Sequence, residues 1–208
     1  MGTAATDIMN LQDQLHAAQS DACALVADLS QEQAAWRADA GSWSVAECVD
    51  HLATTNRVYL DAMQGAAVCA GERGRLRRGP AVPGFVGRWF VKITEPPAKA
   101  PFKMKAPKVI TPRAAPLLAD AFASFLSSHD HLREFLSAYA DLDLAGISFP
   151  NPFVRGIRFS LATGLHVITA HERRHLWQGW RVRRASERAL AQLSRGDDGR
   201  IDAQRMPE

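Results

Sequence analysis

Apolar residues recur at alternating steps of three and four along four long segments of the chain, which is the spacing of one face of an α-helix. These segments run from about residue 8 to 29, from 44 to 63, from 112 or 114 to 139, and from 160 to 194. No segment shows the sustained alternation of apolar and polar residues that a half-buried strand requires. The pattern therefore predicts an all-α protein in which four amphipathic helices form a four-helix bundle.

The start of the second segment carries a helix-initiation signal. Ser44-Val45-Ala46-Glu47 is a capping box, in which the serine hydroxyl accepts a free backbone N–H and the glutamate carboxylate accepts the N–H of the serine. Trp43 and Cys48 occupy the two positions that pack together in a hydrophobic staple. We therefore expect a helix to begin directly after Ser44.

The connection between the second and third segments, residues 71–111, is far longer than a bundle loop requires. Six prolines lie within it. Eleven of the 25 Lys and Arg residues, but only two of the 22 acidic residues, fall between 71 and 113, so this stretch carries a charge of +9 and the rest of the chain −6. The sequence thus predicts a long, basic, proline-rich crossover between the second and third helices.

Aromatic residues within this crossover indicate that it packs over the bundle. Phe85, Trp89 and Phe90 are close enough in sequence to form a short helix near 84–93. The positive charge has two interpretations, a solvated loop or a surface for an anionic partner such as nucleic acid. Because prolines interrupt the basic residues and no helix-turn-helix or sheet platform is present, nucleic acid is not the expected partner.

The bulk composition is that of a globular protein. Hydrophobic residues make up 47% of the 208 positions and charged residues 23%, which is enough for a substantial core. No stretch approaches the ~20 consecutive apolar residues of a membrane span. The first residues lack the pattern of a secretory signal, and three dispersed cysteines are typical of a reducing compartment. We expect one domain spanning 1–195, a flexible tail at 196–208, a cytoplasmic location and no membrane partner.

Histidines at suitable spacing provide the candidate chemistry. His171 and His175 are four residues apart in the fourth segment, so both project from one helix face and can hold one metal ion through two nitrogens. His51, on the second helix, adds a third nitrogen, and three protein ligands with open positions are typical of catalytic metal centres. The alternative is that these histidines are hydrogen-bonded core residues. His129 and His131 are expected on the solvent side of the third helix.

The same stretch spells H-E-x-x-H, the signature of zinc peptidases, with Glu172 in the place of the general base. Such a peptidase needs a third ligand further along the chain. Here Gln178 stands where a glycine usually follows, and Glu187 lies on the same continuous helix, which cannot fold back. The peptidase is therefore the less favoured hypothesis, and Glu172 is a candidate acid/base or a residue that orients a ligand histidine.

Two motifs together resemble a known family. The first is Trp43-Ser44-Val45-Ala46-Glu47-Cys48-Val49-Asp50-His51-Leu52, and the second is His171-Glu172-Arg173-Arg174-His175-Leu176-Trp177-Gln178. They are similar to the helix start and the terminal-helix motif of the DinB/YfiT-like family, the DinB superfamily. The resemblance implies an up-and-down four-helix bundle and a divalent ion, zinc or nickel, held by His51, His171 and His175. It also implies that the protein can form a homodimer.

The expected function follows from the site and the resemblance. Three neutral imidazoles leave a bound ion its full positive charge, which lowers the pKa of a bound water toward ~7 or deprotonates a bound thiol. Characterised members of the resembled family transfer low-molecular-weight thiols. We therefore expect a metal-dependent enzyme, a small-thiol S-transferase or a related hydrolase, acting on a small molecule. The alternative is a non-catalytic stress-response or binding module.

Overall fold

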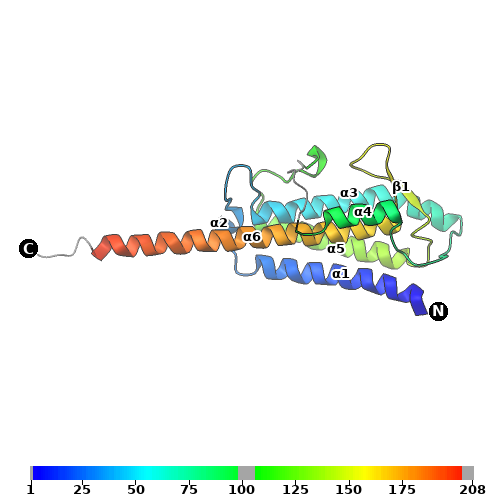
Figure 1. Ribbon diagram of the computed structural model, residues 1–208, viewed down its shortest axis with the longest axis horizontal. Helices are drawn as coiled ribbons and strands as arrows, with labels where there is room; N and C mark the ends of the chain where they lie inside the picture. The colour runs from blue at the N-terminus through cyan, green and yellow to red at the C-terminus, as the bar shows by residue number, and fades with distance from the viewer. Residues whose placement is uncertain (1, 98–105, 203–208) are drawn as a thin grey trace, which may run out of the picture.

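The computed structural model describes residues 2–97 and 106–202 of the 208, with side chains described from residue 6 to 192 outside that gap. Four long helices lie side by side (Figure 1): α1 (Gly2–Val26), α3 (Val45–Glu72), α5 (Leu118–Ala138) and α6 (Leu161–Asp202). Helix α3 packs on α5 and α6, and α1 packs on the same two helices. The expectation of an all-α protein is confirmed. The crossover residues Lys99, Pro101, Lys103 and Lys105 lie outside the described part.

Helix α3 begins where the capping box predicts. The Ser44 hydroxyl accepts the N–H of Glu47 at 3.2 Å, and the Glu47 carboxylate accepts the N–H of Ser44 at 2.9 Å. Both residues are buried, and Arg37 forms an ion pair with Glu47 from the loop that precedes the helix. This cap fixes where α3 begins, about two turns before His51.

Helix α5 begins later than the expected start at 112–114. Ala115 has a φ of 49° in the left-handed region, and it precedes Pro116, which disfavours the helical conformation for the residue before it. The helix therefore starts at Leu118, whose backbone N–H is accepted by the Gln31 side chain at 2.8 Å. Gln31 belongs to a short helix, α2 (Gln31–Ala35), that follows α1.

Helix α6 is longer than expected and continues to Asp202 instead of ending near Arg195. Figure 1 shows its C-terminal part extending beyond the other long helices. Two glycines allow neighbouring helices to approach it closely. A Cβ atom at Gly164 would lie 2.7 Å from the Met63 sulfur, and one at Gly179 would lie 2.7 Å from a methyl carbon of Leu25.

The crossover packs on the bundle, and the short helix expected near 84–93 is confirmed as α4 (Phe85–Thr94). Helix α4 lies against α6. Its Phe90 ring also contacts Phe159, two residues before α6 begins, at a centroid distance of 4.9 Å. A 3₁₀ turn, η1 (Lys108–Ile110), packs on α3 further along the crossover.

A two-stranded antiparallel hairpin, which the hydrophobic pattern did not predict, precedes α6. Strands β1 (Ser148–Pro150) and β2 (Arg158–Ser160) pair with Phe149 opposite Phe159, and both rings are buried. Three-residue strands are too short to show a detectable alternation. None of the described helices has the combination of length and apolar character needed to cross a bilayer.

The core is divided by a buried polar layer. One apolar cluster contains Tyr59, Leu132 and Ile168, and the other contains Leu52, Phe125 and Leu176. Between these positions along α3, α5 and α6 lie six buried polar residues, namely Thr55, Asn56, Ser128, His129, Thr169 and Glu172. A buried polar group lowers stability unless it is paired, so this layer marks a part of the fold that packing alone does not explain.

Candidate metal centre

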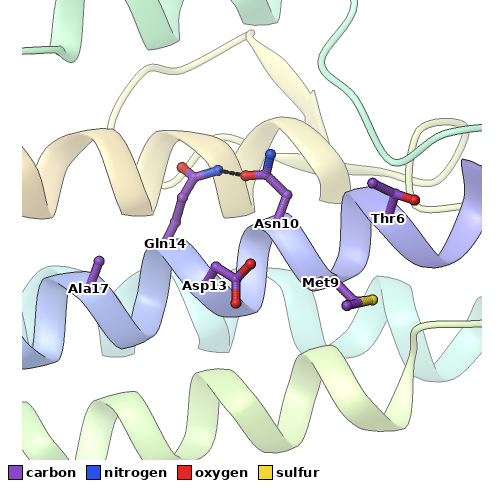
Figure 2. A pocket seen from close by; sticks show the side chains of 6 residues that line it. All are labelled: Thr6, Met9, Asn10, Asp13, Gln14 and Ala17. Atoms are coloured by element: carbon purple, nitrogen blue, oxygen red, sulfur yellow. Dashed lines mark hydrogen bonds between the residues drawn. The ribbon is translucent and has the colours of Figure 1, made fainter.

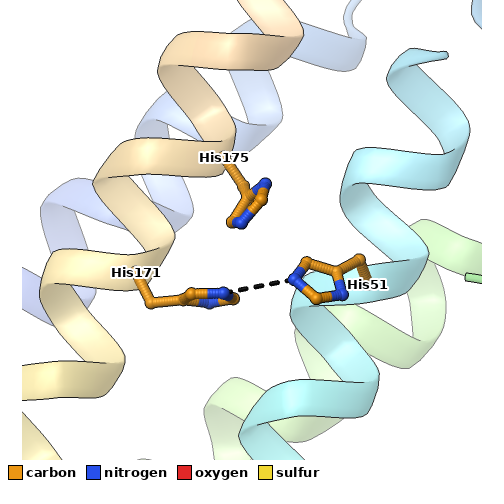
Figure 3. Close-up of side chains that lie close together, drawn as sticks. All are labelled: His51, His171 and His175. Atoms are coloured by element: carbon orange, nitrogen blue, oxygen red, sulfur yellow. Dashed lines mark hydrogen bonds between the residues drawn. The ribbon is translucent and has the colours of Figure 1, made fainter. Parts of the chain in front are cut away.

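The three predicted ligands come together between α3 and α6 (Figure 3). One ligand atom from each of His51, His171 and His175 lies within 4.8 Å of the other two, and the Nε2 atoms of His51 and His171 are 3.1 Å apart. The one-turn spacing on α6 stacks His171 and His175 on one face with ring centroids 4.4 Å apart. The sequence-based prediction that two helices contribute one and two histidines to a single cluster matches this arrangement.

Hydrogen bonds orient two of the rings. The Nδ1–H of His51 donates to the backbone carbonyl of Ile110 at 2.5 Å, and the Nδ1 of His175 pairs with the Gln178 side-chain oxygen at 3.1 Å. A carbonyl oxygen can only accept, so these bonds place the proton on Nδ1 and leave the Nε2 lone pair free. His171 Nδ1 is buried and has no partner among the described residues.

All three rings are held in the neutral form. Burial lowers the pKa of His51 from its ordinary 6.5 to about 4, against the opposing effects of the Ile110 hydrogen bond and the Asp50 charge. Burial also lowers the pKa of His171 well below its usual value, with further lowering from His175 and His51. The pKa of His175 is lowered in the same way, first by burial and then by His51. Neutral imidazole is the form that binds metal.

The donor set fits a divalent transition metal. Zinc binds imidazole nitrogen at about 2.1 Å, so two nitrogens on one ion lie about 3.4 Å apart in tetrahedral geometry. The His51–His171 separation of 3.1 Å is close to that value, and the ligand nitrogen of His175 lies within 4.8 Å of the other two. His51 is buried, whereas His171 and His175 are each partly accessible to solvent. Three protein nitrogens leave a fourth coordination position free on a tetrahedral ion, which is typical of catalytic sites and not of four-ligand structural ones.

Two neighbours of the cluster were not predicted as site residues. The Trp43 ring lies 4.7 Å from that of His51 and 5.6 Å from that of His175, centroid to centroid, so it borders the site. Ile110 supplies its backbone carbonyl from the crossover. Next to His51, the Asp50 carboxylate accepts the backbone N–H and the Nε–H of Arg113, each at 2.8 Å. The crossover is thereby fixed at the edge of the site.

Glu172 points into the polar layer. Its Oε1 atom accepts the Asn56 amide and contacts His129 Nε2, both at 2.8 Å, and Oε2 has no partner among the described residues. The expected solvent-side position of His129 is therefore wrong, because its side chain is 0% exposed, whereas His131 is exposed as expected. His129 is four residues after Phe125 and three before Leu132, both buried, so the helical spacing already contained the signal.

The two arginines that follow Glu172 in the sequence do not pair with it but with residues of other helices. Arg173 forms an ion pair with Glu95 at the end of α4 and also donates to Gln14 of α1 at 2.9 Å. Arg174 donates to the carbonyl of Ile93. Both guanidinium groups therefore tie α6 to the neighbouring helices.

A shallow hollow of about 460 Å³ lies along α1 (Figure 2), and none of the three histidines lines it. It is bounded by Thr6, Met9, Asn10, Asp13, Gln14 and Ala17. All of its lining comes from one helix, and Asp13 is its one titratable group. The candidate chemistry therefore belongs to the histidine cluster.

A helical fold with a three-histidine cluster between two of its long helices defines a class of metal-binding helical proteins. Within this class the chain belongs to the DinB superfamily, whose model matches residues 14–178 and so includes all three histidines. The resemblance carried by the two motifs is confirmed. No curated protein and no solved structure matches the chain at a significant level.

Proposed function

We propose that this DinB-superfamily protein is a metal-dependent enzyme in which His51, His171 and His175 hold one zinc or nickel ion. The observation that carries the proposal is the meeting of three neutral imidazoles within 4.8 Å, two of them oriented by hydrogen bonds to the opposite ring nitrogen. Ring nitrogens held in this way are typical of metal ligands. Family membership supports the same assignment.

The proposed reaction is transfer of a small thiol to a small electrophilic molecule, or a related hydrolysis. A bound ion supplies Lewis acidity, which lowers the pKa of a coordinated thiol or water. In the transfer, the new carbon–sulfur bond forms as the leaving group departs from the electrophile. The partial exposure of His171 and His175 is compatible with substrate entry, and Trp43 offers an apolar wall beside the reacting groups.

We assign Glu172 a positioning role. Its carboxylate is fully buried and bonded to Asn56 and His129, which fixes the α6 backbone between the two ligand histidines. The general base of a zinc peptidase must instead reach a water at the ion. This arrangement therefore favours the DinB-type reading of the H-E-x-x-H stretch over the peptidase.

The helix topology, the domain bounds, the cellular location and the oligomeric state belong to the same proposal. We infer an up-and-down four-helix bundle formed by the four long helices, a domain spanning 1–195, a cytoplasmic location and a capacity to dimerise. The packing of α3 and α1 on both α5 and α6 supports the bundle.

Elemental analysis of the purified full chain tests the metal site. We compare the parent with His51→Ala, His171→Ala and His175→Ala after reconstitution with zinc or nickel, using His131→Ala as a control because His131 is exposed on α5. The expected result is about one ion per chain in the parent and the control, and loss in the three variants at unchanged helical content. No metal in the parent, or full uptake by His171→Ala, would overturn the site.

The reaction is tested separately with the metal-loaded protein. A small thiol and an electrophile are incubated with the parent and with His175→Ala, and the free thiol is followed. Consumption that depends on the parent supports transfer, and release of product without thiol consumption supports hydrolysis. Stoichiometric metal with neither reaction would favour the non-catalytic binding module.

A further inference from the structure

Helix α4 exposes an apolar surface to solvent. We call Phe85, Val86, Trp89 and Ile93 the α4 stripe; their exposed fractions are 81%, 59%, 55% and 41%. Phe85, Trp89 and Ile93 are spaced four residues apart and line one face of the helix, with Val86 beside them. Together with Val82 they are five of the twelve large hydrophobic side chains exposed in the described part of the chain. A concentrated patch of this kind marks an interaction surface.

Positive charge borders the α4 stripe. Arg88 and Lys92 are exposed, and at 100° per residue they fall next to Phe85 on one edge of the stripe. Residues 73–94 contain six Lys and Arg and no acidic residue. The nearest acidic residue on this side, Glu95, is already paired with Arg173. The charge beside the stripe is therefore not neutralised by α4 itself.

The opposite face of α4 is fixed on the bundle, so the stripe cannot turn inward. A Cβ atom at Gly87 would lie 2.4 Å from the Thr163 hydroxyl, which shows how closely the helix backbone approaches α6. Phe90 packs on Phe159, and Arg174 donates to the Ile93 carbonyl at 3.3 Å. The protein thus presents a preformed amphipathic helix whose outer face is apolar with one basic edge.

Among possible occupants of the stripe, a second copy of the chain fits poorly. An antiparallel two-fold contact through α4 would place the Arg88 and Lys92 side chains of both copies on the same side of the interface, which is repulsive. A stable dimer also needs about 800 Å² per partner, more than four side chains of one short helix provide. Nucleic acid would satisfy the basic edge but leave Phe85 and Ile93 against phosphates.

An anionic lipid surface is complementary to both the apolar α4 stripe and its basic edge. We propose that α4 docks the protein reversibly on such a surface, with the α4 stripe entering the boundary between headgroups and acyl chains and with Arg88 and Lys92 contacting lipid phosphates. Tryptophan and phenylalanine on one side with lysine and arginine on the other is the composition of interfacial helices. Docking by a ten-residue helix is weak and reversible. This proposal differs from the sequence-based expectation of no membrane partner, and it is independent of the metal reaction.

Vesicle pelleting of the full chain tests the proposal. The parent is mixed with phosphatidylcholine vesicles that either contain or lack phosphatidylglycerol, at low and high salt. The apolar test variant is Phe85→Ser/Trp89→Ser, and the charge variant is Arg88→Glu/Lys92→Glu. The matched control is Met9→Ser/Val68→Ser, which removes two exposed apolar side chains from α1 and α3. Far-ultraviolet circular dichroism and metal uptake verify that each variant is folded.

The expected result is binding to the anionic vesicles that weakens with salt, falls about tenfold or more in each α4 variant and is unchanged in the control. Absence of binding, or equal binding by Phe85→Ser/Trp89→Ser, would overturn the proposal. A dimer that this variant converts to monomer, without vesicle binding, would assign the stripe to a second copy. Salt-sensitive DNA binding lost in Arg88→Glu/Lys92→Glu, again without vesicle binding, would assign it to nucleic acid.

Discussion

At the scale of single residues, the orientation of a candidate ligand ring depends on the hydrogen bond made by Nδ1, the ring nitrogen that does not face the cluster. His175 is oriented by a side chain, Gln178, one turn further along the same helix. His51 is oriented by a backbone carbonyl from the crossover. Substitutions that spare the ligands can therefore still weaken the site, because a ring that rotates freely must be ordered when the ion binds.

Replacing Gln178 by Ala removes the acceptor for His175 Nδ1–H. We expect metal affinity to fall by about 10-fold to 100-fold while one ion per chain still binds at saturation. Gln178→Glu keeps an acceptor and should restore the affinity. Competition with a chromophoric chelator measures both affinities. Gln64→Ala is the control, because the Gln64 side chain donates to the Tyr139 hydroxyl and not to a residue of the site. Equal affinities for Gln178→Ala and the parent would show that this bond does not orient the ligand.

The buried contact between His129 and Glu172 leads to a stability prediction. His129→Ala leaves the Glu172 carboxylate in the core with Asn56 as its remaining partner, so we expect the free energy of unfolding to fall by about 3 kcal/mol or more. His131→Ala, two residues along the same helix but exposed, should change it by less than about 0.5 kcal/mol. Urea denaturation of the parent, His129→Ala and His131→Ala measures both changes. Similar midpoints for the two variants would argue against the buried contact between His129 and Glu172.

At the scale of helices, the features that depend on residues close in sequence were predictable, and those that depend on distant residues were not. The start of α3 was predictable because the capping box is a contact between residues three apart. The start of α5 was not, because it depends on the left-handed Ala115 and on Gln31, which is distant in sequence. His171 and His175 were recognisable as candidate ligands from their helical spacing, and His51 from its place on the second helix and in the family motif. The Ile110 carbonyl was not recognisable, since every residue carries one. The hairpin was too short to leave a periodic pattern.

The cap of α3 is itself testable. Ser44→Ala removes the side-chain acceptor for the Glu47 N–H, and we expect a loss of about 1 kcal/mol in the free energy of unfolding. Metal uptake should stay at one ion per chain, because His51 lies about two turns further along and is held by tertiary contacts. Ser44→Asp restores an acceptor and serves as the comparison. Thermal unfolding measures the change in stability of both variants, and elemental analysis measures their metal uptake. Loss of metal in Ser44→Ala alone would mean that the cap sets the position of His51.

At the scale of the whole molecule, the stability of the metal-free protein must depend on pH. Burial is the first cause of the lowered pKa of His51, His166, His171 and His175. The unfolded chain, with ordinary values near 6.5, therefore binds more protons than the folded chain once the pH falls below that value. Stability is fully present above that value and decreases as the pH falls.

We expect the free energy of unfolding of the metal-free protein to decrease from about pH 7 to pH 5, by up to ~1.4 kcal/mol per pH unit for each histidine that is kept neutral. His51→Ala should give a shallower dependence, since it removes one of these groups, whereas His131→Ala should not change the slope. Urea denaturation at several pH values, with a chelator present, measures the slope. A stability that is constant over this range would contradict the neutral burial of the histidines.

The hydrogen bond from His51 to the Ile110 carbonyl has a consequence for how such a site changes over evolutionary time. The acceptor is a peptide oxygen, so it survives any replacement of the side chain at that position that leaves the local backbone path intact. The crossover can therefore accumulate substitutions while still performing its part in holding the ligand. Divergence in this segment is then poor evidence that a relative has lost the site, and the path of the chain past His51 is the better criterion.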